Sequence, residues 1–199
     1  MKFTFRRKYK GCQYMCGDGK IAILHGENCN NYKKDALKML ENVIKVGEPY
    51  RIICAGTMKV SGDSVSPRVG TLLKKAGLEN VIGCMEDQIH ALNDIEKLKD
   101  IDRNIKTILV IGMRCDLPKD SYDFGLYTKN GTSVIGRGVH PEKEEVCIGN
   151  VSMGICVGDI FKINGVKQEA VDNRVKILVD VLKEFDTRHR GIQQITMDI

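Results

Sequence analysis

Long apolar runs are missing from this sequence, and their absence excludes several classes of protein. No run approaches the roughly 20 consecutive apolar residues that a membrane-spanning helix needs. The N-terminus, MKFTFRRKYKG, carries charge but is not followed by an apolar stretch with a small-residue cleavage site, so it does not predict a secretory signal. We therefore expect a cytoplasmic protein that does not bind a membrane.

The glycine-rich motifs that bind nucleotides are also missing. The glycines of AGTMKVSGDS lack the G-x-G-x-x-G spacing, and the chain contains no P-loop. Internal repeats, low-complexity segments and linkers are absent as well. A chain of 199 residues with 42% hydrophobic and 29% charged residues therefore predicts one soluble domain over residues 1–199, with no cofactor.

The charge balance does not favour a nucleic-acid partner. The net charge is +5, from 31 basic and 26 acidic residues, and much of the excess lies within the first ten residues. A basic arm could contact nucleic acid or an acidic partner. Because no basic stripe continues elsewhere, we favour a solvated edge strand, in which lysines discourage pairing with other chains.

The eight cysteines indicate a reducing environment, with one further possibility near the N-terminus. Five lie in or beside apolar, strand-like runs, as reduced buried cysteines do: Cys54, Cys84, Cys115, Cys147 and Cys156.

Within the cysteine-containing basic segment 1–30, four soft ligands have the spacing C-x3-C-x8-H-x3-C: Cys12, Cys16, His25 and Cys29. They could hold zinc tetrahedrally, but the spacing matches no strong zinc template. The alternative is that they are small packing residues near a chain end.

Apolar runs alternate with helical periodicity along the chain, which predicts an α/β fold. Strands are expected at 20–25, 50–56, 80–85, 106–113 and 147–158, and helices at about 31–46, 65–76, 90–102 and 168–185. Residues 122–145 are rich in glycine and turn residues and predict short strands and a long loop. Such an alternation predicts a three-layer α/β/α sandwich with a mostly parallel central sheet.

Function collects at the carboxyl ends of the strands in such sheets, and Asp63 follows one of these ends. Asp63 stands before Ser-Val-Ser-Pro and an apolar periodic run, which also predicts a helix N-cap worth about 1 kcal/mol. A cap and a catalytic carboxylate are compatible, so both interpretations of Asp63 stay open.

The segment around Asp63 resembles the YyaC-type family of predicted sporulation proteins of spore-forming Firmicutes. These share a fold and a motif with germination protease, an aspartate-dependent endopeptidase, and more distantly with hydrogenase maturation proteases. The family pattern C-I-G-T, a loop and G-D-S-L-G-P appears here as CAGT at 54–57 and GDSVSP at 62–67. The pattern G-T-x-x-x-P-V-H-A-x-N-L appears as GCMEDQIHALND at 83–94.

The match covers roughly residues 51–157, within a family-like core at 50–185. It implies a phosphorylase/hydrolase-like, hydrogenase-maturation-protease-like fold.

The resemblance also implies a pair of catalytic carboxylates, of which this chain retains the first. Two such groups share a proton, so that one activates water while the other protonates the substrate. Asp63 matches the first, but the second, in the family motif I-D-A-C, falls on Met113 of GMRC at 112–115. Asp116 is the nearest carboxylate. It could replace the lost group only if the chain turned after Cys115, because residues 113 and 116 of a straight strand face opposite sides.

Further candidates for substrate binding lie near the expected strand ends. They are Ser64 beside the aspartate, Glu86 and His90 after the next strand, and His140 in the loop GRGVHPEKEE. In that loop the small residues that follow the proline in the family are replaced by charged ones. For Glu86, His90 and His140 the alternative is an ordinary polar or solvent-exposed loop.

Three functions follow from these residues. The first is an aspartate-dependent endopeptidase that uses Asp63 and Asp116 and acts on a peptide or protein. The second is a catalytically inactive relative that binds a peptide or partner in the sporulating cell or forespore. The third is a metal-dependent hydrolase or maturation factor, with Asp63, His90 or His140 as ligands.

Overall fold

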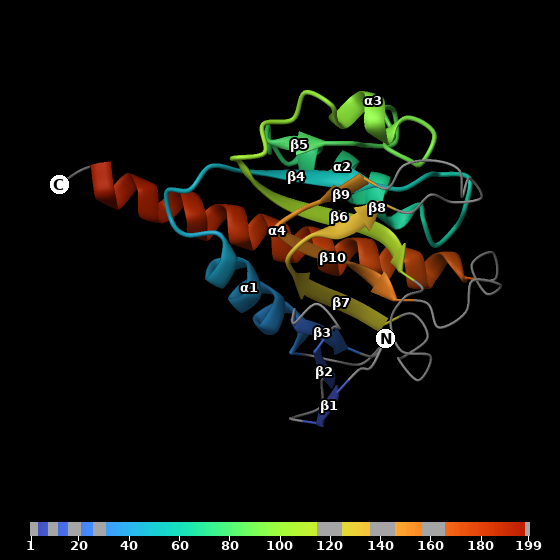
Figure 1. Cartoon of the computed structure of the whole chain (residues 1–199), viewed down its shortest axis with the longest axis horizontal. Coiled ribbons are helices and arrows are strands. Elements are labelled where there is room, and N and C mark those ends of the chain that lie inside the picture. The colour runs from blue at the N-terminus through green and yellow to red at the C-terminus, as the bar shows by residue number, and fades with distance from the viewer. Residues whose placement is uncertain are drawn as a thin grey trace.

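The computed structural model describes residues 4–7, 12–15, 21–25, 31–114, 125–135, 146–156 and 166–197 (Figure 1). Ten strands and four helices lie in this part of the chain. The strands are β1 (Thr4–Arg7), β2 (Cys12–Met15), β3 (Ile21–His25), β4 (Tyr50–Ala55), β5 (Val81–Ile82), β6 (Lys106–Arg114), β7 (Gly125–Asn130), β8 (Ser133–Ile135), β9 (Val146–Ile148) and β10 (Val151–Cys156). The helices are α1 (Tyr32–Val43), α2 (Val65–Lys75), α3 (Asp94–Leu98) and α4 (Gln168–Met197).

The main sheet has the strand order β1-β2-β3-β7-β10-β6-β4-β5. The sheet has a parallel part and an antiparallel part, which meet at β10. The parallel part is β10-β6-β4-β5, and the antiparallel part is β1-β2-β3-β7-β10. The predicted α/β class is confirmed, with the parallel strands grouped around the expected site. The N-terminal arm is the edge strand β1, as the sequence predicted.

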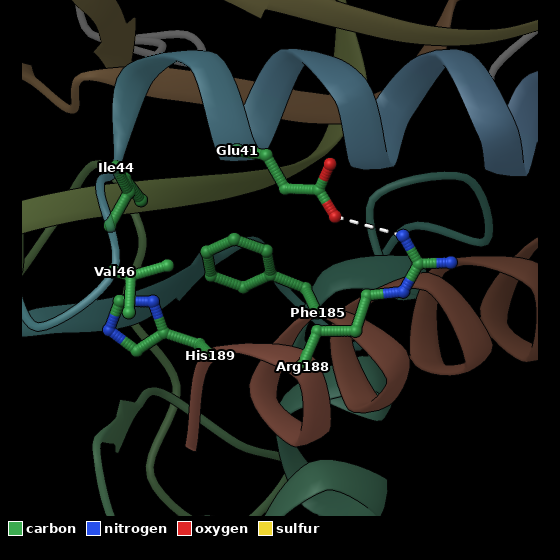
Figure 2. Close-up of a pocket in the computed structure, with 6 residues that line it drawn as sticks. All are labelled: Glu41, Ile44, Val46, Phe185, Arg188 and His189. Atoms are coloured by element: carbon green, nitrogen blue, oxygen red, sulfur yellow. Dashed lines mark hydrogen bonds and ion pairs between the residues drawn. The ribbon is translucent and has the colours of Figure 1, made fainter. Parts of the chain in front are cut away.

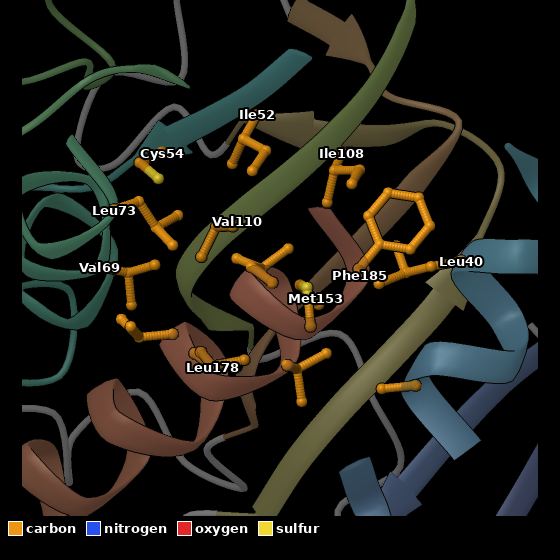
Figure 3. Close-up of a cluster of buried hydrophobic side chains, with 14 of the residues drawn as sticks. Leu40, Ile52, Cys54, Val69, Leu73, Ile108, Val110, Met153, Leu178 and Phe185 are labelled. Atoms are coloured by element: carbon orange, nitrogen blue, oxygen red, sulfur yellow. The ribbon is translucent and has the colours of Figure 1, made fainter. Parts of the chain in front are cut away.

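Alternating side chains of the central strands supply the two hydrophobic cores. On one face, Ile52, Cys54, Ile108 and Val110 pack against α1, α2 and α4 (Figure 3). On the other face, Ile53 and Ala55 of β4 and Leu109 and Ile111 of β6 pack against α3, which contributes Leu98, and against the β8–β9 pair, which contributes Ile135. Because β4 and β6 are apolar on both faces, they are continuous apolar runs in the sequence.

Four elements differ from their predicted bounds. The strand expected at 80–85 is the short β5, Val81–Ile82. The run expected as one strand at 147–158 is two strands, β9 and β10, which belong to different sheets on either side of Gly149 and Asn150. Helix α3 is shorter than expected. Helix α4 continues to Met197, and its last turns project beyond the sheet (Figure 1).

Among the helices in the described part of the chain, none combines the length and the apolar character needed to cross a bilayer.

Candidate functional site

Asp63 lies at the carboxyl ends of β4 and β6, in the loop that joins β4 to α2. A Cβ placed on Gly56, just after β4, would lie 2.3 Å from the Asp63 carbonyl oxygen. A Cβ on Gly112 of β6 would also lie 2.3 Å from that oxygen and 2.6 Å from the Asp63 Cα. The two glycines therefore form a cradle in which only residues without a side chain allow the Asp63 backbone to approach both strands.

The Asp63 carboxyl group is partly buried and has one hydrogen-bond partner in its own loop. The Thr57 N–H donates to Oδ2 over 2.8 Å. Burial raises the pKa of Asp63 to about 6, and the Thr57 hydrogen bond opposes this rise because it stabilises the charged form. A carboxyl group with such a pKa can both take up and release a proton near neutral pH, as a general acid–base must.

The predicted N-cap role of Asp63 is wrong. The N-cap of α2 is Ser64, and no side chain caps this helix. Residues 60–65 already form a turn in which the Ser64 N–H donates to Val60 O and the Val65 N–H to Gly62 O. Backbone carbonyls thus satisfy amides at the start of α2, and the Asp63 carboxylate binds the Thr57 amide instead.

Ser64, a predicted substrate-binding residue, is buried and braces this turn. Its Oγ donates to Ser61 O over 2.6 Å. The neighbouring Ser66 donates to Val110 O over 2.6 Å and so ties the first turn of α2 to β6. Both hydroxyl groups therefore have a partner within the scaffold that holds the Asp63 loop.

The segment between β5 and α3 forms a second wall beside this loop. The Gly56 N–H donates to Ile89 O over 2.8 Å, which places the next residue, His90, at the carboxyl end of β4. His90 is partly buried, and its Nδ1 accepts from the Leu92 N–H over 3.3 Å, which leaves Nε2 to carry the proton of a neutral ring. Glu86 is exposed and accepts from Thr71 Oγ1 over 3.3 Å, toward α2.

Asn93 stabilises the turn that carries His90. Its Oδ1 accepts from the His90 N–H over 3.0 Å, and its Nδ2 donates to Gln88 O over 3.1 Å. Of the predicted candidates, then, Asp63 and His90 lie on two segments joined by backbone hydrogen bonds.

A β-bulge interrupts β6 where the second carboxylate was expected. Ile111 pairs with Gly154 of β10, but Arg114 pairs with Cys156, so Gly112 and Met113 together lie opposite Ile155. The strand is therefore not straight at this point, and its strict alternation is broken. Asp116 and His140 lie outside the described residues, and their proposed roles stay predictions.

The N-terminal cysteine and histidine residues are only partly described. His25 is the last residue of β3 and is buried, with Nε2 3.3 Å from Asp35 Oδ2, and burial lowers its pKa. Cys12 begins β2, where it pairs with Leu24. Cys16 and Cys29 lie outside the described residues, so the zinc site stays a prediction. Within the described part of the chain, no three His, Cys, Asp or Glu residues lie close enough to hold a metal ion.

A cavity of about 390 Å³ lies between α1 and α4 (Figure 2). It is lined by Glu41, Ile44, Val46, Phe185, Arg188 and His189. The His189 ring lies 5.0 Å from that of Tyr50, the first residue of β4, whereas Asp63 follows the end of that strand. The charged groups of the cavity pair with each other, since Arg188 donates to Glu41 over 2.9 Å.

Sequence reasoning missed three residues of this site: Thr57 and Gly112, which contact Asp63, and Gln88, which binds the Met58 N–H. A glycine within the otherwise apolar run of β6 is a signal of close backbone approach and could have identified Gly112. Thr57 acts through its backbone N–H, which no side-chain pattern reveals. Gln88 lies in a polar loop without periodicity.

Comparison with known proteins is consistent with the resemblance seen in the sequence. Residues 24–182 match a family described as "Protein of unknown function (DUF1256)". The chain is also 28% identical, over 145 residues, to the "Uncharacterized protein YyaC" of Bacillus subtilis (strain 168), an alignment that covers 70% of this chain and 71% of that protein.

Proposed function

The chain belongs to the DUF1256 family, and from this membership together with the geometry of Asp63 we propose that it is a sporulation protein with an aspartate-dependent peptidase site. The observation that carries the proposal is the Asp63 carboxyl group, held at the ends of β4 and β6 with its pKa raised to about 6. Open α/β sheets bind their ligands at this edge.

Peptide hydrolysis requires a group that first accepts a proton from water and then donates it to the leaving amine. The ionised Asp63 takes a proton from the attacking water as the new C–O bond forms, and its protonated form returns that proton to the leaving amine as the C–N bond breaks. Asp116 is the candidate for the second acid of the pair, which protonates the substrate carbonyl. Such general acid–base catalysis typically contributes about 10²–10⁴-fold to a rate. The resemblance to germination protease supports peptides as the substrate class.

A second candidate is a protein that binds peptides at the same edge of the sheet without cleaving them. The identity of residue 113 favours this alternative, because a methionine stands where the family motif has its second aspartate. A thioether cannot share a proton with Asp63, so the site would keep its shape and lose half of its chemistry.

Met113→Asp is expected to create or increase peptide cleavage. Met113 matches the second aspartate of the family motif, so the resemblance implies that a carboxyl group introduced at 113 restores the second acid of the pair. Two carboxyl groups at such a site titrate as a pair with separated pKa values. The measurement is the cleavage rate of Met113→Asp beside that of Met113→Asn, which introduces polarity without an acid. Equal rates for the two variants would contradict the expectation.

The test of the main proposal is incubation of the purified full chain with a diverse peptide mixture, with the products read by mass spectrometry. Cleavage that is lost in Asp63→Asn and unaffected by EDTA supports the peptidase. Cleavage that EDTA abolishes would replace it by the metal-dependent hydrolase. Peptides that bind to the wild-type protein but are not cut would favour the binding protein.

A further inference from the structure

The structure assigns Gln88 a positioning role: its side chain fixes the Thr57–Met58 turn and so keeps the Thr57 N–H on the Asp63 carboxylate. This inference rests on the proposed function, because it concerns the residue that would set when Asp63 is charged. Gln88 does not contact Asp63 in any hydrogen bond described above, and it acts through the backbone between them.

Three successive backbone amides after β4 carry the argument. The Gly56 N–H donates to Ile89 O over 2.8 Å, the Thr57 N–H to Asp63 Oδ2 over 2.8 Å, and the Met58 N–H to Gln88 Oε1 over 2.9 Å. The amides on either side of Thr57 are therefore both bound to the segment 88–89. With its two neighbours held, the Thr57 peptide group has little freedom to turn away from Asp63.

Both the side-chain amide and the backbone carbonyl of Gln88 are held by hydrogen bonds. Its Nε2 donates to Met85 O over 3.1 Å, so the side-chain amide has a donor and an acceptor partner that agree on one orientation. Its backbone carbonyl accepts from Asn93 Nδ2 over 3.1 Å and from Lys97 Nζ over 3.0 Å. A partly buried side chain held in this way is a rigid support for the Met58 amide.

The consequence concerns the ionisation of Asp63. Burial raises its pKa, and the Thr57 N–H is the group that opposes this rise. If the turn loosens, the charged carboxylate loses part of that hydrogen bond, and its pKa rises further. In the family pattern quoted above, proline stands at this position, and a proline side chain has no oxygen for the Met58 amide. The acceptor is therefore a feature of this chain.

The test is Gln88→Met, which keeps the length and approximate volume of the side chain and removes its oxygen. Two quantities are measured by NMR on the full chain: the titration of the Asp63 carboxyl carbon and the hydrogen exchange of the Thr57 and Met58 amides. We expect the Asp63 midpoint to move upward by about half a pH unit or more, with both amides exchanging at least 10-fold faster.

The controls separate positioning from a general loss of structure. Gln168→Met makes the same chemical change at the start of α4, where the amide donates to Asp172, and is expected to leave both the Asp63 midpoint and the exchange of the two amides unchanged. Gln88→Glu retains an acceptor and is expected to restore slow exchange at Met58. If Gln88→Met does not fold, Gln88→Asn, which keeps the amide but shortens its reach, provides the same measurement.

Faster exchange at Met58 alone, with the Thr57 amide and the Asp63 midpoint unchanged, would overturn the proposal, because Gln88 would then support only the loop. Both readouts are independent of cleavage. If the wild-type protein has no peptidase activity but Gln88→Met still shows the shifted Asp63 midpoint, the proposed function is contradicted and the positioning role of Gln88 is retained.

Discussion

Asp63→Asn is expected to stabilise the protein at pH 7.5 while it lowers peptide cleavage at least 100-fold. Asparagine has nearly the same shape as aspartate, and its side-chain oxygen can still accept the Thr57 N–H. It carries no charge, so the cost of burying a carboxylate disappears together with the acid–base chemistry. A gain in stability that accompanies a loss of activity is typical of residues retained for catalysis.

The sign of the effect follows from the raised pKa. The pKa of Asp63 is about 6 in the folded protein, against a reference value of 3.8. Between these two values the folded state binds more protons than the unfolded state, so the contribution of Asp63 to stability falls as the pH rises from about 4 to about 6 and is constant above that. Because each pKa unit corresponds to about 1.4 kcal/mol, the difference between the two pKa values means that the charged group costs about 3 kcal/mol at pH 7.5, and near pH 4 it costs only a small part of that.

The measurement is urea unfolding of the wild-type protein and Asp63→Asn at pH 4 and pH 7.5. The variant is expected to be the more stable at pH 7.5 and equal to the wild type at pH 4. Asp100→Asn, which removes an exposed carboxylate, serves as the matched control and should unfold as the wild type does at both values. A variant that is less stable at pH 7.5 would mean that the Asp63 carboxylate has a stabilising partner instead of an unfavourable burial.

The central strands could be predicted from the sequence because the apolar pattern within each segment is enough to indicate the element. The continuous apolar run at 50–56 predicts a strand, and β4 occupies Tyr50–Ala55. Helix α2 was equally readable, since Val65, Val69 and Leu73 recur at helical spacing and lie together on the core-facing side.

Pairing between distant segments could not be predicted in the same way. A single apolar run at 147–158 gives no sign that Gly149 and Asn150 divide it between two sheets, because β9 is fixed by its pairing with β8. Helix α4 continues past Phe185 through mostly polar residues, which give no regular apolar stripe that a sequence pattern could use. Tertiary context decides such cases.

The candidate site was predictable in its position and not in its details. Strand order and the G-D-S motif led to Asp63, yet the partner of its carboxylate is the backbone N–H of Thr57, six residues earlier. The expected cap was wrong because the turn at residues 60–65 satisfies amides there with its own carbonyls. The bulge at Gly112 and Met113 depends on how β6 pairs with β10, which local sequence does not encode.

Gly112→Ala is expected to lower the stability of the protein by about 2 kcal/mol or more and to disturb the Asp63 site. The new Cβ would lie 2.3 Å from the Asp63 carbonyl oxygen, 2.6 Å from its Cα and 2.7 Å from its carbonyl carbon. All three are backbone atoms, which cannot turn aside as the end of a flexible side chain can. Either β6 or the loop that carries Asp63 must move.

Of the two segments, the loop that carries Asp63 is held by fewer backbone hydrogen bonds and is expected to move. Strand β6 is paired on both sides, with β4 and β10, whereas Asp63 belongs to a turn that joins β4 to α2. The displacement should therefore fall on Asp63, lengthen its hydrogen bond to the Thr57 N–H and raise its pKa, in addition to the loss in the free energy of unfolding. Urea unfolding and titration of the Asp63 carboxyl carbon measure the two effects separately.

Gly191→Ala makes the same substitution at an exposed position of α4, where no atom lies within 4 Å of the added Cβ. It is expected to leave stability unchanged or to raise it by up to about 1 kcal/mol, because alanine favours helix. If Gly112→Ala matched this control in both unfolding and the Asp63 midpoint, the contact between β6 and the Asp63 backbone would not constrain the site. If Gly112→Ala lost stability with the Asp63 midpoint unchanged, β6 would have moved instead of the loop. The hydrogen bond from the Thr57 N–H, and not the contact with Gly112, would then fix the position of the Asp63 carboxyl group.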